Sequence, residues 1–121
     1  MKVKKNRAFT LIELMVAISI LALLATGLLT AYTSCVLLNL SNINFTKAAN
    51  NAQSVLEELA SAPYSDIVTQ TYPAFGNLQN ETVTVDVTTT TNKKEVVVEV
   101  NWAERGRDNN FKLFTVFYED E

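Results

Sequence analysis

The sequence of 121 residues contains no histidine and a single cysteine, Cys35. A Ser-His-Asp triad and a Cys-His dyad both need histidine, so neither can be built within this chain. The usual zinc ligand sets of several Cys and His side chains are excluded as well. One cysteine cannot form an intramolecular disulfide. Because no nucleophile is paired with a base, we expect no enzyme, no catalytic residue, no bound metal and no cofactor.

Proline and glycine are also scarce. The two prolines are Pro63 and Pro73, and Gly27 is the only glycine before Gly76. Since proline is the residue that breaks a helix interior most strongly, nothing obligatory interrupts a helix from Phe9 to about Ala62. The sequence therefore predicts one long helix over residues 9–62, with a local bend or melt at Gly27 as a hypothesis.

Charge is nearly absent from the first part of that helix. Between Arg7 and Lys47 the only charged residue is Glu13. The apolar run over about 14–34 matches the roughly 20 residues that cross a bilayer, whereas the apolar region of a secretory signal is about 7 to 15 residues long. We therefore predict a single membrane-spanning helix. The four basic residues before Phe9 would stay in the cytoplasm and the C-terminal part would lie outside it.

Glu13 is the residue of this run that calls for an explanation. A carboxylate at the bilayer centre costs about 2.5 to 3.5 kcal/mol, so an intramembrane acid indicates a functional site whose partner must be found. The nearby cations all precede Phe9, but cleavage before Phe9 would create a new amine there. That amine would meet Glu13 within one helix or between two helices. The alternative is an unpaired acid in the headgroup region of an ordinary signal anchor.

The stretch Arg7-Ala8-Phe9-Thr10-Leu11-Ile12-Glu13-Leu14 resembles the processing site of type IV pilins and of the pseudopilins of type II secretion systems. The resemblance implies that a prepilin peptidase cuts between Ala8 and Phe9, removes the basic leader 1–8 and methylates the new amine of Phe9. It also implies that Glu13 is the assembly residue, which contacts the Phe9 amine of a neighbouring subunit and sets the axial register. Most members have glycine where this chain has Ala8.

The resemblance further implies a location and partners. The chain would be inserted in the inner membrane, in contact with lipid, and would meet the prepilin peptidase, an assembly platform and other pilin or pseudopilin subunits. Loss of residues 1–8 leaves six basic against thirteen acidic residues, which argues against direct nucleic-acid binding. Many major pilins carry a C-terminal disulfide loop, which one cysteine cannot supply. We therefore expect a minor pilin or minor pseudopilin, whose helix end resembles residues 55–64.

A different function class remains open. The chain would then be an extracytoplasmic binding domain that never polymerises, held by its uncleaved signal anchor or by a lipid on Cys35. The sequence does not distinguish a pilus from a secretion or DNA-uptake filament.

The second half of the predicted helix is amphipathic over about 45–62. Its apolar residues recur at steps of three and four, which is typical of a helix with one covered face: Phe45, Ala48, Ala49, Ala52, Val55, Leu56 and Leu59. The other side is polar: Lys47, Asn50, Asn51, Gln53, Glu57 and Glu58. A loop is expected over 63–80, anchored by Tyr64, Ile67, Tyr72 and Phe75.

The last third is rich in alternating valine and threonine, which indicates strands. Strands are predicted over 81–90, 95–102 and 111–118, with turns over 91–93 and 105–110. The expected fold is α+β and pilin-like, with the long helix packed on a three-stranded antiparallel sheet in an extracytoplasmic domain, residues 63–121. The last strand is apolar on both sides, which suggests a second covered face or a subunit contact. The acidic end Glu119-Asp120-Glu121 with Asp108 is a weak calcium candidate, against a solvated terminus.

Overall fold

A computed structural model describes residues 9–119 of the chain. The first element is helix α1, Leu11–Ser61. The chain divides into two compact units, Met1–Asn39 and Leu40–Glu121, and α1 contributes residues to both. The leader predicted at residues 1–8 lies outside the described residues.

The predicted long helix is confirmed, and its bounds lie within two residues of the expected ones. It continues through Gly27 without a break, so the melt suggested there is not present in this structure. Near Gly27 the hydroxyl of Thr30 donates hydrogen bonds to the carbonyls of Gly27, at 2.8 Å, and Thr26, at 3.1 Å. Such bonds satisfy the hydroxyl within the helix and need no partner from outside it.

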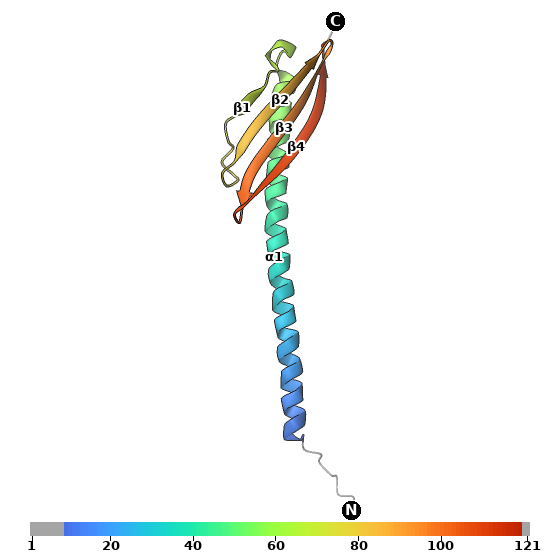
Figure 1. The fold of residues 1–121 in the computed structure, drawn as a ribbon, viewed down its shortest axis with the longest axis vertical. Helices are drawn as coiled ribbons and strands as arrows, with labels where there is room; N and C mark the ends of the chain where they lie inside the picture. Colours follow the sequence, from blue (N-terminus) through green and yellow to red (C-terminus); the bar gives the residue numbers. More distant parts are fainter. Residues whose placement is uncertain (1–8, 120–121) are drawn as a thin grey trace, which may run out of the picture. The chain divides into compact units, whose positions relative to one another are not determined.

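After Pro63 come a short 3-10 helix, η1 (Tyr64–Asp66), and four strands: β1 (Gln70–Tyr72), β2 (Thr82–Thr90), β3 (Lys93–Glu104) and β4 (Arg107–Tyr118). They form one antiparallel sheet in the order β1-β2-β3-β4, as Figure 1 shows. The expectation of three strands was therefore one short. β1 lies in the predicted loop, where three residues are too few to display an alternating pattern.

The β3–β4 connection corrects a second expectation. Arg105 and Gly106 have φ values of 53° and 73°, as the two central residues of a type I′ hairpin turn require. The turn therefore has two residues, not the six predicted over 105–110. β4 begins at Arg107 instead of Phe111, and the polar residues Asn109 and Asn110 pair with β3. Because these residues are polar, the sequence pattern did not indicate a strand there. Backbone pairing with β3 nevertheless extends β4 to the hairpin turn.

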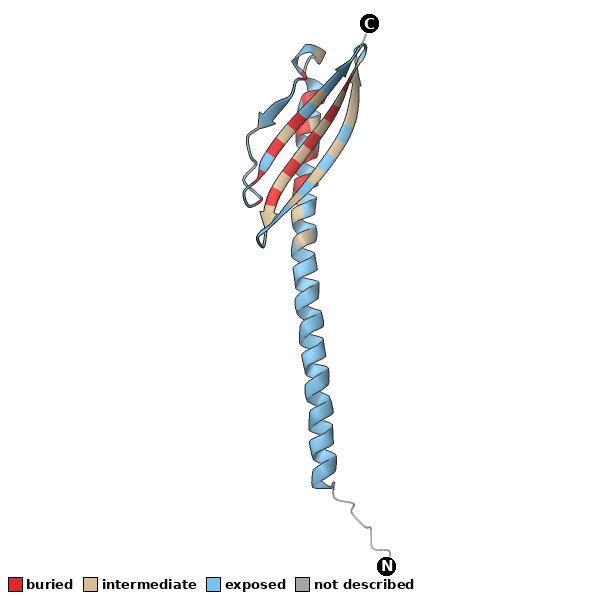
Figure 2. Ribbon diagram, in the orientation of Figure 1, coloured by how far each residue is buried: buried red, intermediate tan, exposed pale blue. Residues whose placement is uncertain are grey.

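The hydrophobic core lies between residues 48–59 of α1 and one face of the sheet, where Figure 2 shows the buried residues. The helix contributes the predicted apolar stripe, in which the fully buried members are Ala48, Ala52, Val55 and Leu59. The sheet contributes the alternate residues of β2 and β3: Val83, Val85, Val96, Val98, Val100 and Trp102. The Phe45 ring meets the Trp102 ring edge to face at 5.0 Å between centroids, although Phe45 itself is 41% exposed, so it covers the edge of this core.

A network of hydrogen bonds connects the loop before β2 to helix α1. Asn51, predicted to face solvent, is buried and donates hydrogen bonds to Asn77 at 2.9 Å and to the buried carboxylate of Glu81. The other carboxylate oxygen of Glu81 accepts from the Gly76 amide at 2.9 Å. Leu78 is buried in this loop while Phe75, the predicted anchor, stays exposed. Asn51 faces inward because these loop partners satisfy its amide.

Lys94 of β3 binds the segment that follows α1 to the sheet. Its buried ammonium donates to the carbonyls of Tyr64 at 2.6 Å and Ile67 at 2.9 Å, and lies 4.5 Å from the centre of the Tyr64 ring. A cation is favourable beside carbonyls that follow the end of a helix. Two sheet-to-segment contacts thus hold the chain between the helix and the strands.

Candidate functional site

The N-terminus of α1 holds a reciprocal pair of hydrogen bonds between Thr10 and Glu13. The Glu13 amide donates to the Thr10 hydroxyl at 3.3 Å, and one Glu13 carboxylate oxygen, Oε2, accepts from the Thr10 amide at 3.4 Å. The Thr10 hydroxyl also lies 3.4 Å from Oε2. This is a capping box, in which a Thr at the N-cap and a Glu three residues later satisfy amides that lack helical partners.

The capping box was not recognised from the sequence, although its signal was present. Thr10-Leu11-Ile12-Glu13 has the Ser/Thr-x-x-Glu spacing immediately before an apolar helix. The position of Glu13 therefore has a local cause in addition to any role in assembly. A carboxylate in the first turn is also favoured by the positive end of the helix dipole.

The capping box leaves part of the Glu13 carboxylate available. All the hydrogen bonds found for this side chain within residues 9–119 use Oε2, so Oε1 has no donor there. Phe9 lies four residues before Glu13 and is 82% exposed. Ala8, the other residue of the predicted cleavage site, lies outside the described residues. Within residues 9–119 the site thus offers an exposed Glu13 with one carboxylate oxygen that has no donor, and an exposed aromatic residue at the start of the helix.

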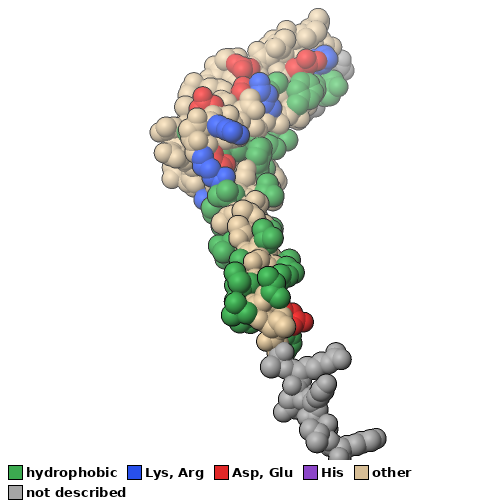
Figure 3. Space-filling view, turned by 60° about the horizontal axis from the view of Figure 1, so that its bottom comes forward, with side chains coloured by type: hydrophobic (Ala, Val, Ile, Leu, Met, Phe, Trp, Pro, Cys, Tyr) green, Lys and Arg blue, Asp and Glu red, His purple; other side chains and the backbone are tan. Residues whose placement is uncertain are grey.

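An exposed apolar surface surrounds the helix beyond Glu13. Every side chain from Leu11 to Leu40 is exposed, and Figure 3 shows apolar side chains along this part of the chain. By length and composition the helix can cross a membrane. The hydroxyls of Ser19, Thr26 and Thr33 each donate to the carbonyl four residues earlier. The helix therefore presents few unsatisfied polar groups to a lipid or protein partner.

Cys35, the residue of the alternative lipid anchor, is a free and exposed side chain inside α1. Cleavage directly before it would remove the apolar residues 11–34 and divide a continuous helix. The structure gives Cys35 no distinct environment within that helix.

The structure separates Asp108 from Glu119 in the calcium candidate. Asp108 lies near the start of β4 and Glu119 directly follows its end, roughly 37 Å apart at 3.4 Å per residue. Asp120 and Glu121 lie outside the described residues. Within residues 9–119 no three acidic, His or Cys side chains are grouped to hold a metal ion.

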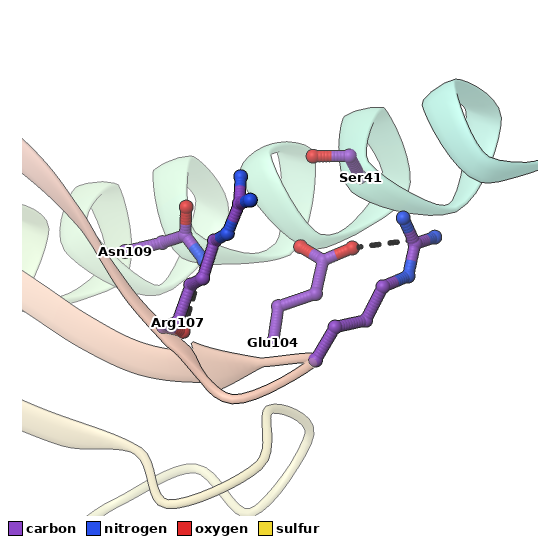
Figure 4. Close-up of a pocket in the computed structure, with 5 residues that line it drawn as sticks. Ser41, Glu104, Arg107 and Asn109 are labelled. Carbon is purple, nitrogen blue, oxygen red and sulfur yellow. Dashed lines mark hydrogen bonds and ion pairs between the residues drawn. The ribbon is translucent and has the colours of Figure 1, made fainter. Parts of the chain in front are cut away.

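A polar hollow lies beside the β3–β4 turn, with a volume of about 330 Å³. Its lining residues are Ser41, Glu104, Arg105, Arg107 and Asn109, drawn in Figure 4. A carboxylate oxygen of Glu104 lies 3.9 Å from the Arg105 guanidinium. Both arginines lie within the turn predicted from the sequence over residues 105–110.

Comparison with known proteins identifies the N-terminal segment. A family described as the prokaryotic N-terminal methylation motif matches residues 3–29. No curated protein and no solved structure matches the chain. The matched segment is the prepilin signal of type IV pilin-like proteins, and it includes Ala8, Phe9, Thr10 and Glu13. It supports a pilin-like or pseudopilin precursor, implies processing by a prepilin peptidase and assembly with other pilin subunits, and fits membrane anchoring.

Proposed function

We propose that this chain, whose residues 3–29 carry the prepilin-type methylation motif, is a minor pilin or minor pseudopilin. In this proposal the prepilin peptidase hydrolyses the Ala8–Phe9 peptide bond and transfers a methyl group to the Phe9 amine. The processed chain stays in the inner membrane with its C-terminal domain outside the cytoplasm. An assembly platform then draws it into a type IV pilus or a type II secretion filament.

The observation that carries the proposal is Glu13 at the start of an exposed apolar helix. Its Oε2 atom caps the helix through Thr10, while Oε1 has no donor within residues 9–119. The Phe9 amine of a neighbouring subunit is the natural partner of that oxygen. Attraction between two unit charges is much stronger in a low-dielectric setting than in water, so the pair would fix the axial offset of two helices.

Assembly would also provide partners for the apolar helix surface. Apolar helices in a bilayer associate mainly through van der Waals packing and small residues, because lipid is as apolar as leucine. Residues 11–40 are exposed along their whole length, so several neighbours can pack around one helix. Packing would therefore supply attraction, and the Glu13 pair would select one register.

The first experiment measures the mature N-terminus by mass spectrometry, in cells that contain the prepilin peptidase. We expect a chain that begins at an N-methylated Phe9. A chain that retains residues 1–8 would contradict the proposal. A lipid on Cys35 would instead support the non-polymerising binding domain.

The second experiment compares Glu13→Gln with Glu13→Ala. Glutamine still completes a capping box but carries no charge, whereas alanine removes both the cap and the charge. If Glu13 pairs with an amine, both variants stay in the membrane and both fail to enter filaments. Normal incorporation of Glu13→Gln would show that only capping matters and would remove the proposed assembly role.

A further inference from the structure

The sheet has two open edges, formed by β1 and β4. Each of these strands has one neighbouring strand within residues 9–119, and Figure 1 shows them on opposite sides of the sheet. After the end of α1, the large apolar residues that are exposed in the described part of the chain belong to these two strands or flank them. Val68 and Phe75, 50% and 46% exposed, flank β1, whereas Phe114 and Tyr118, 61% and 69% exposed, lie on β4.

The second half of β4 has the composition of a strand that pairs. Residues 113–118 read LFTVFY, without charge, proline or glycine. Such a segment on an open edge pairs readily with another strand, and natural edges usually carry a charge or a proline that prevents this. The charge nearest to the segment, on Lys112, is paired with a Glu99 carboxylate at 3.2 Å. The edge of β4 therefore lacks the usual protection against a strand partner.

The backbone groups of β4 alternate between two directions. The amide of Glu119, directly after β4, donates to the carbonyl of Asn92, directly before β3, at 3.2 Å. In an antiparallel pair such bonds are made by alternate residues, so the odd-numbered residues of β4 bond to β3. The amides and carbonyls of Phe114, Val116 and Tyr118 therefore point away from β3. A row of such unpaired backbone groups is a template for another strand.

The topology determines how two copies of the chain can meet. The order β1-β2-β3-β4 is antiparallel at every step, so β1 and β4 run in opposite directions. Copies whose helices cross one membrane in the same direction share one orientation relative to that membrane. β4 of one copy beside β1 of the next is then antiparallel. β4 beside β4 would be parallel, which is slightly less stable per residue.

We propose that the open edge of β4 in one copy of this chain pairs with β1 of a second copy. The two edges differ, so the contact is heterologous, and its repetition continues one antiparallel sheet along an open row of copies. The inference rests on the proposed function, because insertion in a common membrane supplies the shared orientation. Pairing also brings the exposed apolar residues of the two edges together.

The area of the contact suits copies that are held together by their anchors. The four exposed apolar residues at the edges can bury roughly 400 Å² on pairing, whereas a stable interface buries roughly 1,200 to 2,000 Å². Two copies free in solution would therefore separate readily. Anchoring in one membrane or filament raises their effective concentration, so that a contact of this size suffices.

The pairing predicts which side chains come together. Residues directly opposite one another share a face of the sheet. The registers of the three strand pairs place Thr71 of β1 on the same face as the even-numbered residues of β4, which is the face opposite the core. Phe114, Val116 and Tyr118, the outer-face residues of β4, therefore lie on the side of Thr71, and Thr115 lies on the other side.

Cysteine cross-linking in the full chain tests this prediction. In a Cys35→Ser background, one population carries Thr71→Cys and a second carries cysteine at one of the three outer-face residues of β4. After co-expression with the other filament components and mild oxidation, we expect a mixed disulfide dimer for at least one of the three. Thr115→Cys should give at least tenfold less, because its side chain points to the other face.

Three results of the cross-linking would overturn the proposal. The first is the absence of a mixed dimer at all three outer-face residues in assembled filaments. The second is an equal yield with Thr115→Cys, which would show random collision. The third is a stronger dimer from the β4 population alone, which would indicate β4–β4 pairing.

A proline on the open edge provides an independent measurement. Val116→Pro removes an amide that points away from β3, so the bonds between β3 and β4 remain. It should lower the cross-link made by Phe114→Cys or Tyr118→Cys about tenfold, since backbone bonds between the copies are lost. Asp108→Pro is the matched control, because its amide also points outward but lies near the hairpin turn. Trp102 fluorescence during denaturation checks that both variants fold. Equal losses in two folded variants would contradict the pairing.

The mature N-terminus separates this inference from the proposed function. If Phe9 is methylated and filaments form but no mixed dimer appears, the pairing is wrong and the proposed function stands. If Phe9 is not methylated, the proposed function itself fails, whatever the yield of the cross-link. Cross-links from Thr71→Cys only to a different filament subunit would assign the edge to that subunit and reject the second copy.

Discussion

Residues 9–39 and residues 40–119 use similar apolar side chains in opposite ways. In the first region every side chain is exposed, although leucine, isoleucine, valine and alanine dominate the sequence. In the second region the same residue types form a core between α1 and the sheet. Apolar burial contributes about 25 cal/mol per Å² removed from water. The second region obtains this stabilisation within one chain, and the first requires lipid or other helices.

The largest expected effect compares one substitution in both regions. Leu59→Ala should lower the free energy of unfolding by about 2 to 5 kcal/mol, because Leu59 is 2% exposed and its loss leaves a cavity. Leu24→Ala, at a position 64% exposed, should leave the unfolding of residues 40–119 unchanged. Denaturation of the full chain in detergent micelles, followed by the fluorescence of the single Trp102, measures both. Equal losses of unfolding free energy in the two variants would contradict the difference between the two regions.

The next effect concerns the buried lysine. Lys94→Met removes the donors to the Tyr64 and Ile67 carbonyls, and we expect a loss of about 1 to 3 kcal/mol in the same assay. Lys93→Met is the control. Lys93 pairs with Glu95 at 2.6 Å in a more exposed position, so its removal should have a much smaller effect. A larger loss for Lys93→Met would show that the carbonyl contacts of Lys94 do not stabilise the fold.

A smaller effect is expected at the start of the exposed helix. Thr10→Ala removes the hydroxyl of the capping box and should cost about 1 kcal/mol of local helix stability. Amide hydrogen exchange should become faster at Ile12, Glu13 and Leu14, with no change near Leu59. Thr26→Ala, which removes a hydroxyl that bonds within the helix, should leave the first turn protected. Unchanged exchange in Thr10→Ala would mean that the capping box is not formed.

The smallest effect appears at alkaline pH. Burial raises the pKa of Tyr72 above 10.0, the charge of Glu58 raises it further, and the hydrogen bond from Gln70 lowers it. The unfolded phenol therefore ionises first, so stability is fully present below pH 10.0 and is lost as pH rises through the folded pKa. Tyr72→Phe should reduce this alkaline loss, whereas Tyr32→Phe in the exposed helix should not. An unchanged slope in Tyr72→Phe would contradict the role of burial.

The long helix and its covered stripe were predictable because both depend on local pattern. No proline interrupts residues 11–61, and the steps between Ala48, Ala52, Val55 and Leu59 mark one face. The short strand β1 and the early start of β4 were not predictable. β1 exists because Gln70–Tyr72 pairs with β2, and Asn109 and Asn110 are strand residues because β3 pairs with them.

The polar contacts also divide into local ones, which the sequence predicts, and long-range ones, which it does not. The places of Phe9 and Glu13 at the start of the helix can be predicted from the order of residues alone. The capping box of Thr10 and Glu13 can be predicted in the same way, because its two residues are only three apart in the sequence. The partners of Asn51, Glu81 and Lys94 depend on segments distant in the sequence. The pattern of residues within one segment does not predict which carbonyl or carboxylate of a distant segment will be its hydrogen-bond partner.

By itself the sequence determined a long helix, an apolar first region with one acid, and a signal for processing, since each depends on residues that are neighbours along the chain. Only the tertiary structure decided that the sheet has four strands, that Asn51 and Lys94 face inward, and that Asn109 and Asn110 belong to β4. These features arise from pairing between distant segments, where backbone hydrogen bonds and buried polar groups must be satisfied together.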